Sequence, residues 1–142
     1  MAQQSRLARL TAHELAELIK DGEISPVEIA EACLERIESL NPSLNAFISI
    51  TKDQALAQAR KAEREIRGGV YKGPLHGIPY APKDIFATKG IRTTNGSQAT
   101  ADWIPDFNST VITRLDAAGA VMLGKLNLHE FAIGGGVESG FG

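Results

Sequence analysis

A lysine set among apolar residues is the feature of this sequence that most clearly suggests catalytic chemistry. Lys83 lies in the stretch from Gly77 to Phe86, where isoleucine, tyrosine, alanine and two prolines surround it. Such a setting predicts partial desolvation, and desolvation favours a neutral amine that can accept a proton near neutral pH. The alternative is an ion pair with Asp84 or another nearby carboxylate that only holds the loop. On spacing alone, the ion pair is the favoured interpretation.

A second stretch, Gly119 to Lys125, fits the first seven positions of a phosphate-binding loop. The eighth position is Leu126, so the hydroxyl that would hold magnesium is missing. The four residues between the two glycines, Ala120 to Leu123, are all apolar, which is typical of a core strand and not of a cradle of backbone N–H groups. We therefore reject nucleotide binding at this stretch.

The histidines give no metal-binding pattern. His13, His76 and His129 are far apart in the sequence. His129 and Glu130 could begin a zinc-protease motif, but Ile133 stands where the second histidine would fall. We expect neither a metal nor a cofactor.

Other residues that could act as nucleophiles or bind a ligand have simpler structural interpretations. Cys33 lies on the apolar stripe of a predicted helix and is expected in the core, not as a nucleophile. Ser97 follows Asn95 and Gly96, a common turn signal, so the turn is favoured over a nucleophilic role. The run Gly134 to Gly136 could form a backbone-only wall of a binding pocket, or a flexible end.

Composition narrows the class of protein. Of the 142 residues, 43% are hydrophobic and 23% charged, which indicates a folded globular chain rather than a disordered one. The net charge of -2 comes with no cluster of Lys and Arg, which argues against direct nucleic-acid binding. No apolar run fits a signal peptide or a membrane span, and one cysteine allows no internal disulfide. We expect a cytoplasmic protein.

Helix signals dominate residues 10–68. Thr11 with Glu14, and Ser25 with Pro26 and Glu28, have the spacing of capping boxes that begin two helices. The second is predicted to end at 41–42, before a strand at 45–50 and a third helix that begins at Thr51 and ends at 68–69.

Residues 70–142 have a different character. The stretch 71–96 is rich in glycine and proline and is predicted to be a functional loop. A helix after Ser109, a buried strand at 120–123 and a short helix capped by Asn127 and Glu130 follow. This order predicts α/β architecture. The strand at 120–123 lacks enough partners for a large sheet, so we expect one part of a bigger domain.

Several of these segments together resemble the amidase signature family. Gly73 to Pro79 followed by Lys83-Asp84 is similar to the lysine motif of the family, and the stretch from Ala118 to Ala132 is similar to its next block. The matching positions in that second block are Ala118 to Val121, Gly124-Lys125, Asn127 and Glu130 to Ala132, with Gly90, Thr94, Gly96 and Ser97 fitting between the blocks. The resemblance extends from about Leu10 to Gly142.

The resemblance implies a large α/β domain with a mixed sheet flanked by helices, of which residues 1–142 would be the N-terminal fragment. It implies a Ser-Ser-Lys mechanism in which neutral Lys83 draws a proton through a bridging serine and so activates a serine nucleophile. The loop matching Phe131 to Gly136 borders the substrate pocket in the family. Gly134, Gly135 and Gly136 are therefore candidate substrate-binding residues.

In the family both serine motifs follow the block that ends near Gly142, and neither is in these residues. We therefore expect the chain alone to be inactive, because the nucleophile and its oxyanion donors contribute most of the catalysis.

Three functions remain open. The first is an amidase that hydrolyses a small carboxylic amide to acid and ammonia. The second is the glutaminase subunit of a tRNA-dependent amidotransferase. That subunit typically has threonine and a Gly-Ser-Ser run where this sequence has Leu126 and Gly134 to Gly136, so the hydrolase is favoured. The third is a non-catalytic remnant. The expected partner is a small amide substrate, with no membrane. The alternatives for a protein partner are other copies of the chain or, for the amidotransferase, partner subunits.

Overall fold

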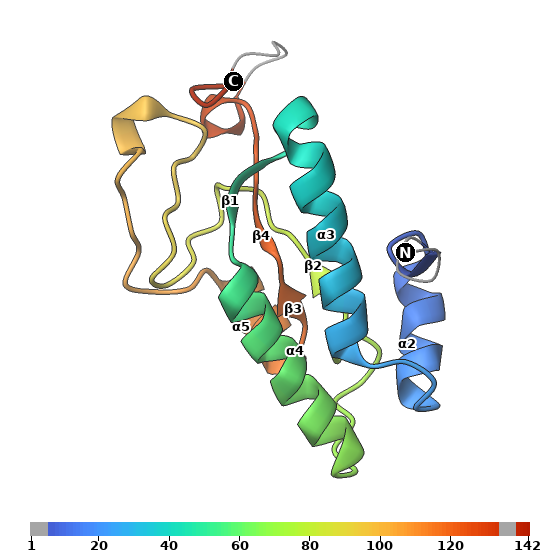
Figure 1. Ribbon diagram of the computed structural model, residues 1–142. Helices are drawn as coiled ribbons and strands as arrows, with labels where there is room; N and C mark the ends of the chain where they lie inside the picture. Colours follow the sequence, from blue (N-terminus) through green and yellow to red (C-terminus); the bar gives the residue numbers. More distant parts are fainter. Residues whose placement is uncertain (1–5, 134–138) are drawn as a thin grey trace.

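The computed structural model describes residues 6–133 and 139–142 (Figure 1). Helices α3 and α4 lie side by side over short strands, and a long loop follows β2. The elements in chain order are α2 (Ala12–Lys20), α3 (Pro26–Leu44), β1 (Phe47–Ile50), α4 (Lys52–Arg67), β2 (Pro79–Tyr80), η1 (Gln98–Thr100), α5 (Thr110–Ala117), β3 (Val121–Met122), β4 (Gly124–Leu126) and η2 (Glu130–Ala132). The mixed α/β class expected from the sequence is confirmed.

Both predicted capping boxes are present. The Thr11 hydroxyl accepts from Glu14 N at 3.2 Å, and Thr11 N donates to the Glu14 carboxylate at 2.7 Å. Ser25 and Glu28 repeat this arrangement at the start of α3. Each box satisfies backbone donors that the first helical turn leaves without partners, which is why these two starts could be read from the sequence.

The predicted end of α3 at 41–42 is wrong, because the helix continues through Pro42 to Leu44. Proline removes the N–H that would bond to the carbonyl four residues earlier, but that carbonyl belongs to Glu38 on an exposed face and can be hydrated. The helix ends at Asn45, which adopts the left-handed conformation with φ 48°. Beyond it, the Asn41 side chain bonds to both main-chain groups of Phe47 and directs the chain into β1.

The strands form two small ladders that together give a mixed arrangement. β1 pairs with β4 antiparallel, and β2 pairs with β3 parallel. The parallel ladder extends past β2, since Lys83 forms an isolated parallel bridge with Leu126. The segment from Ala120 to Leu123 is buried, as predicted.

Two apolar clusters join the helices to the strands. One contains Ala55 and Ala59 of α4 with Val121 beneath them, and the other packs Ile19 of α2 against Ile29 of α3. Cys33 packs against both clusters. Burial raises the pKa of the Cys33 thiol, which disfavours the nucleophilic thiolate and supports its predicted place in the core.

Gly124 allows β4 to lie directly against β1. A Cβ at this position would overlap the main-chain oxygen of Ser49, and a strand backbone cannot move as a flexible side chain can. We expect Gly124→Ala to lower the free energy of unfolding by roughly 3 kcal/mol, near the top of the range for overpacking. Urea denaturation would measure it.

Gly90→Ala is the matched control for this prediction. Gly90 also has a positive φ, 73°, but a Cβ there would meet no atom within 4 Å. The control should therefore show only the backbone cost of about 1 kcal/mol. Equal losses in the two variants would contradict the close approach at Gly124.

Candidate active site

The main chain around Lys83 is fixed by the strand bridge to β4. Asp84 N donates to Leu126 O at 2.9 Å, and Leu126 N donates to Pro82 O at 2.8 Å. Side chains alternate along this extended segment, so Pro82 and Asp84 are buried while Lys83 and Ile85 are exposed. The desolvation of Lys83 expected from its apolar neighbours is therefore not found within these residues, because Pro82 turns to the opposite face and Ile85, on the same face, is itself exposed. Its catalytic role stays a prediction.

The ammonium of Lys83 is held by a main-chain carbonyl. Nζ donates to Asn127 O at 2.7 Å, and Asn127 N in turn donates to Ala46 O at 2.8 Å. The Asn127 side-chain amide donates to Asn45 O at 3.1 Å and to Gly142 O at 2.9 Å. The carbonyl that accepts from Lys83 therefore belongs to a residue that itself donates three hydrogen bonds.

The favoured alternative, in which Lys83 pairs with Asp84, is wrong. Asp84 instead forms an ion pair with Lys125 of β4, whose Nζ lies 3.0 Å from Oδ1, and both side chains are 0% exposed. Within the described part of the chain, no carboxylate forms an ion pair with Lys83.

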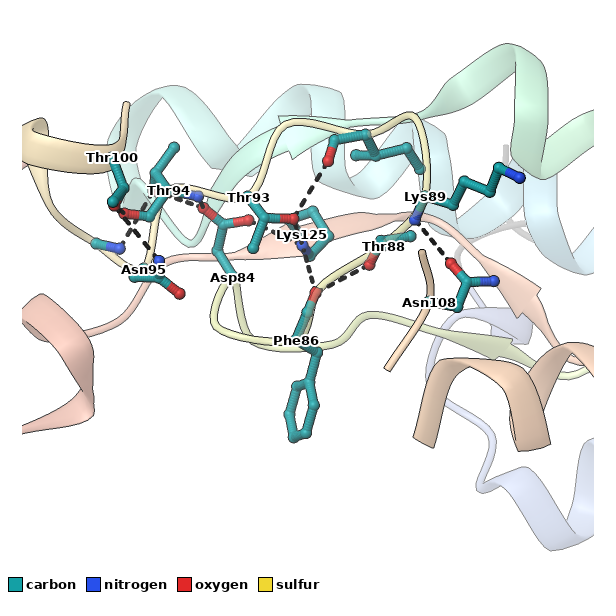
Figure 2. A network of polar contacts seen from close by, with 12 residues as sticks. Asp84, Phe86, Thr88, Lys89, Thr93, Thr94, Asn95, Thr100, Asn108 and Lys125 are labelled. Carbon is teal, nitrogen blue, oxygen red and sulfur yellow. Dashed lines mark hydrogen bonds and ion pairs between the residues drawn. The ribbon is translucent and has the colours of Figure 1, made fainter. Parts of the chain in front are cut away.

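Lys125 and Asp84 form the centre of a buried polar network (Figure 2). Lys125 Nζ also donates to Phe86 O at 2.9 Å and to Thr93 Oγ1 at 2.8 Å. The second oxygen of Asp84 accepts from Thr94 N at 2.8 Å and from Thr94 Oγ1 at 2.6 Å. Burial lowers the pKa of Lys125, while the hydrogen bond and charge of Asp84 oppose that shift.

This network explains the lysine of the rejected phosphate-loop pattern. Lys125 directs its charge inward to Asp84 and is not available to a nucleotide. The sequence interpretation gave Lys125 no role. The signal that could have identified it is a lysine directly after the fully apolar run Ala120 to Leu123, where a charge inside the core requires a buried partner.

Ser97 has a structural role, as the turn interpretation predicts. Asn95 and Gly96 both have positive φ, 55° and 70°, and form the turn. Ser97 Oγ then accepts from Ala99 N at 3.2 Å at the start of η1 and donates to Glu130. The Ser97 side chain is fully buried, which does not suit a nucleophile that must meet a substrate.

The predicted short helix at 127–132 is only the three-residue turn η2, and its predicted caps are wrong. Asn127 Oδ1 accepts from Leu128 N and from Ser139 Oγ, while Glu130 accepts from Ser97. The left-handed conformation of Phe131, with φ 50°, stops the helix from continuing. Gly134, Gly135 and Gly136, the candidate substrate-binding residues, lie outside the described residues.

His76 is also accounted for by contacts within the fold. Its Nδ1 accepts from Lys72 N at 3.2 Å, so the neutral ring carries its proton on Nε2, which lies 3.0 Å from Glu65 Oε2. Burial lowers the pKa of His76 and favours this neutral form. Over residues 6–133 and 139–142, no group of three acidic, histidine or cysteine residues is placed to hold a metal ion, and no helix has the length and hydropathy to cross a bilayer.

The family model described as Amidase matches residues 28–142. Among curated proteins, the A subunit of glutamyl-tRNA(Gln) amidotransferase from Geotalea daltonii is 48% identical over 135 residues, which are 95% of this chain and 28% of that protein. The corresponding protein of Methylococcus capsulatus is 49% identical over 133 residues, 94% of this chain and 27% of that protein. The chain thus spans about a quarter of the length of these relatives.

The fold of the chain also matches solved structures of amidases. The native peptide amidase from Stenotrophomonas maltophilia has a TM-score of 0.81 and 38% identity, covering 87% of this chain and 26% of that one. A bacterial aryl acylamidase, described as belonging to the amidase signature enzymes, has a TM-score of 0.81 and 31% identity, covering 89% and 27%. The match of the family model over most of the sequence and these shared folds show that the chain belongs to the amidase signature family.

Proposed function

We propose that these 142 residues are part of an enzyme that hydrolyses a carboxylic amide to an acid and ammonia, with Lys83 as the base. The observation that carries the proposal is the setting of Lys83. Its main chain is anchored to β4, and its ammonium meets a carbonyl instead of a carboxylate among the described residues. A lysine with no anionic partner can lose its proton more readily than one in an ion pair.

The other catalytic groups would come from sequence that follows these residues in the complete polypeptide. The family mechanism uses a bridging serine and a serine nucleophile, and Lys83 presents its amine on the exposed side of the segment, where such groups could approach. The base would draw a proton through the bridging serine as the nucleophile attacks the amide carbonyl. Ammonia would leave, and water would release the acid from the acyl-enzyme.

The chain alone should lack this activity. Stabilisation of the oxyanion is usually the largest contribution to acyl transfer, and it requires donors placed beside the nucleophile. In the complete enzyme, Gly134, Gly135 and Gly136 would border the substrate with backbone groups, because glycine lets a main chain approach a ligand closely.

A second function shares the same chemistry. The identities of 48% and 49% to the glutamyl-tRNA(Gln) amidotransferase proteins exceed the 38% to peptide amidase. This favours a glutaminase subunit that works with partner subunits. Against it stand Leu126 and Gly134 to Gly136, which replace the threonine and the Gly-Ser-Ser run typical of that glutaminase. Both functions begin with attack on a primary carboxamide, so the role proposed for Lys83 is the same.

Ammonia release by the complete polypeptide separates these functions. We expect turnover of small amides without partner subunits if the protein is a free-standing hydrolase. Hydrolysis of glutamine that rises at least tenfold when the amidotransferase partner subunits are added would instead identify the glutaminase. A folded complete polypeptide that releases no ammonia from either kind of substrate, with or without partners, would contradict both and favour a non-catalytic protein.

A further inference from the structure

We propose that the buried Asp84–Lys125 pair is a positioning device for Lys83, which fixes its main chain and keeps the neighbouring carboxylate from becoming its counter-ion. This inference rests on the proposed function, because it assigns a role to the pair through the base. Asp84 and Lys125 are fully buried and paired with one another, so both would act through Lys83 as positioning residues.

Each residue of the pair is next to a residue of the strand bridge that holds Lys83. Lys83 and Asp84 are neighbours in the chain, with Cα atoms about 3.8 Å apart, and Lys125 precedes Leu126, the bridge partner of Lys83. Alternation sends Asp84 inward and Lys83 outward from the same strand. The inward ion pair therefore holds the strand segment from which the outward amine projects.

The network also holds the loop that follows. Lys125 Nζ bonds to Phe86 O and Thr93 Oγ1, at the two ends of the loop, and the Asp84 carboxylate accepts from both the hydroxyl and the main-chain N of Thr94. Figure 2 shows these groups converging from the loop and from β4 on the two charges. A single ammonium thus connects β4 with both ends of the loop.

The charge of the pair matters because Asp84 is the carboxylate nearest to Lys83 along the chain. A free anion there would favour the protonated form of the base. Lys125 neutralises that anion at 3.0 Å within a fully buried environment, where Coulomb interactions are strong. The charge of Lys125 therefore offsets the charge of Asp84, the residue next to Lys83.

Other charged groups on neighbouring segments do not replace Lys125. The loop after Asp84 carries Lys89 and Arg92, and Arg92 lies 5.6 Å from the centre of the Phe141 ring. The segment after β4 carries His129 and Glu130, and Glu130 accepts from Ser97. The remaining charged groups of the adjoining loop are Asp102 and Asp106. Over the described ranges, none of these groups forms an ion pair with Lys83, Asp84 or Lys125.

The test is the pH dependence of kcat/KM in the complete enzyme. Lys125→Met removes the cation, while the two hydrogen bonds that Thr94 donates to the Asp84 carboxylate stay in place. The acid limb of the profile should then move to higher pH by about one unit, equal to a tenfold loss of kcat/KM on that limb. The double variant Asp84→Asn with Lys125→Met removes both charges and should return the limb to its wild-type position.

These outcomes separate a positioning role from a merely structural one, because the limb position does not depend on how much enzyme is folded. An unmoved limb in Lys125→Met, or a double variant still shifted to higher pH, would overturn the inference. If Lys125→Met does not fold, Thr93→Val removes one acceptor of Lys125 with both charges kept. It should lower kcat roughly three- to tenfold at constant KM, and an unchanged kcat would overturn the inference.

Lys83→Met distinguishes failure of this inference from failure of the proposed function. If Lys83→Met keeps wild-type activity, the proposed function itself is wrong. If it is inactive while the acid limb of Lys125→Met stays in place, only the positioning role of the pair is wrong.

Discussion

Replacing Lys83 with methionine should lower kcat/KM of the complete enzyme for its amide substrate by roughly 10²- to 10⁴-fold, the usual contribution of a general base. Methionine keeps an unbranched side chain but cannot accept a proton. The fall should appear in kcat and kcat/KM alike, because the proton moves only as the nucleophile attacks. Initial rates of ammonia release at several substrate concentrations would measure both constants.

Lys89→Met is the control for this prediction. Lys89 is also exposed and lies six residues further along the same loop, where its main chain N, and not its amine, bonds to Asn108. We expect Lys89→Met to keep wild-type kinetics. We also expect the thermal midpoint of Lys83→Met to stay near the wild-type value, because its side chain is exposed and makes one hydrogen bond. Comparable kinetics in the two variants would refute a base at Lys83.

The features that the sequence predicted well are those decided by neighbouring residues. The Thr11–Glu14 and Ser25–Glu28 boxes form within one helical turn, so their spacing carries the whole signal. The buried strand at Val121 is likewise marked by an unbroken apolar run. Such features require no knowledge of what packs from elsewhere in the chain.

The direction of the Lys83 side chain could not be predicted from its apolar neighbours. An extended chain sends alternate side chains to opposite faces, so Pro82 and Asp84 are buried while Lys83 and Ile85 are exposed among the described residues. The carboxylate beside it, Asp84, is paired across 41 positions of sequence with Lys125. Pairing of this kind depends on the register of β4 against the segment after β2, which local patterns do not encode.

Pro42 shows the same dependence on context. Proline inside a helix is expected to break it, yet here the carbonyl that loses its donor is on an exposed face. The end of α3 is set instead by Asn45 in the left-handed conformation, and the Asn41 side chain then bonds to Phe47 in the following strand. The bonds from Asn41 to Phe47 depend on the position of β1, which the local sequence does not show.

Lys125→Met should lower the free energy of unfolding of the protein by about 3–5 kcal/mol, the range for breaking a buried ion pair. The loss comes mainly from Asp84, whose Oδ1 would be left in the core without its cation. Asp84→Asn alone should cost a similar amount, since it leaves a buried ammonium without its anion. Chemical denaturation of each variant, followed by circular dichroism, would measure these losses.

The double variant, Asp84→Asn with Lys125→Met, should cost much less than the sum of the two. The hydrogen bonds to Phe86 O and Thr93 Oγ1 are then lost, but no buried charge is left without its partner, which predicts a loss of about 1–3 kcal/mol. Lys52→Met is the control, because its ion pair with Glu38 is half exposed, at 53% and 50%, and should contribute little. Additive losses at Asp84 and Lys125 would mean that the two charges do not stabilise one another, since residues in direct contact should show a large coupling energy.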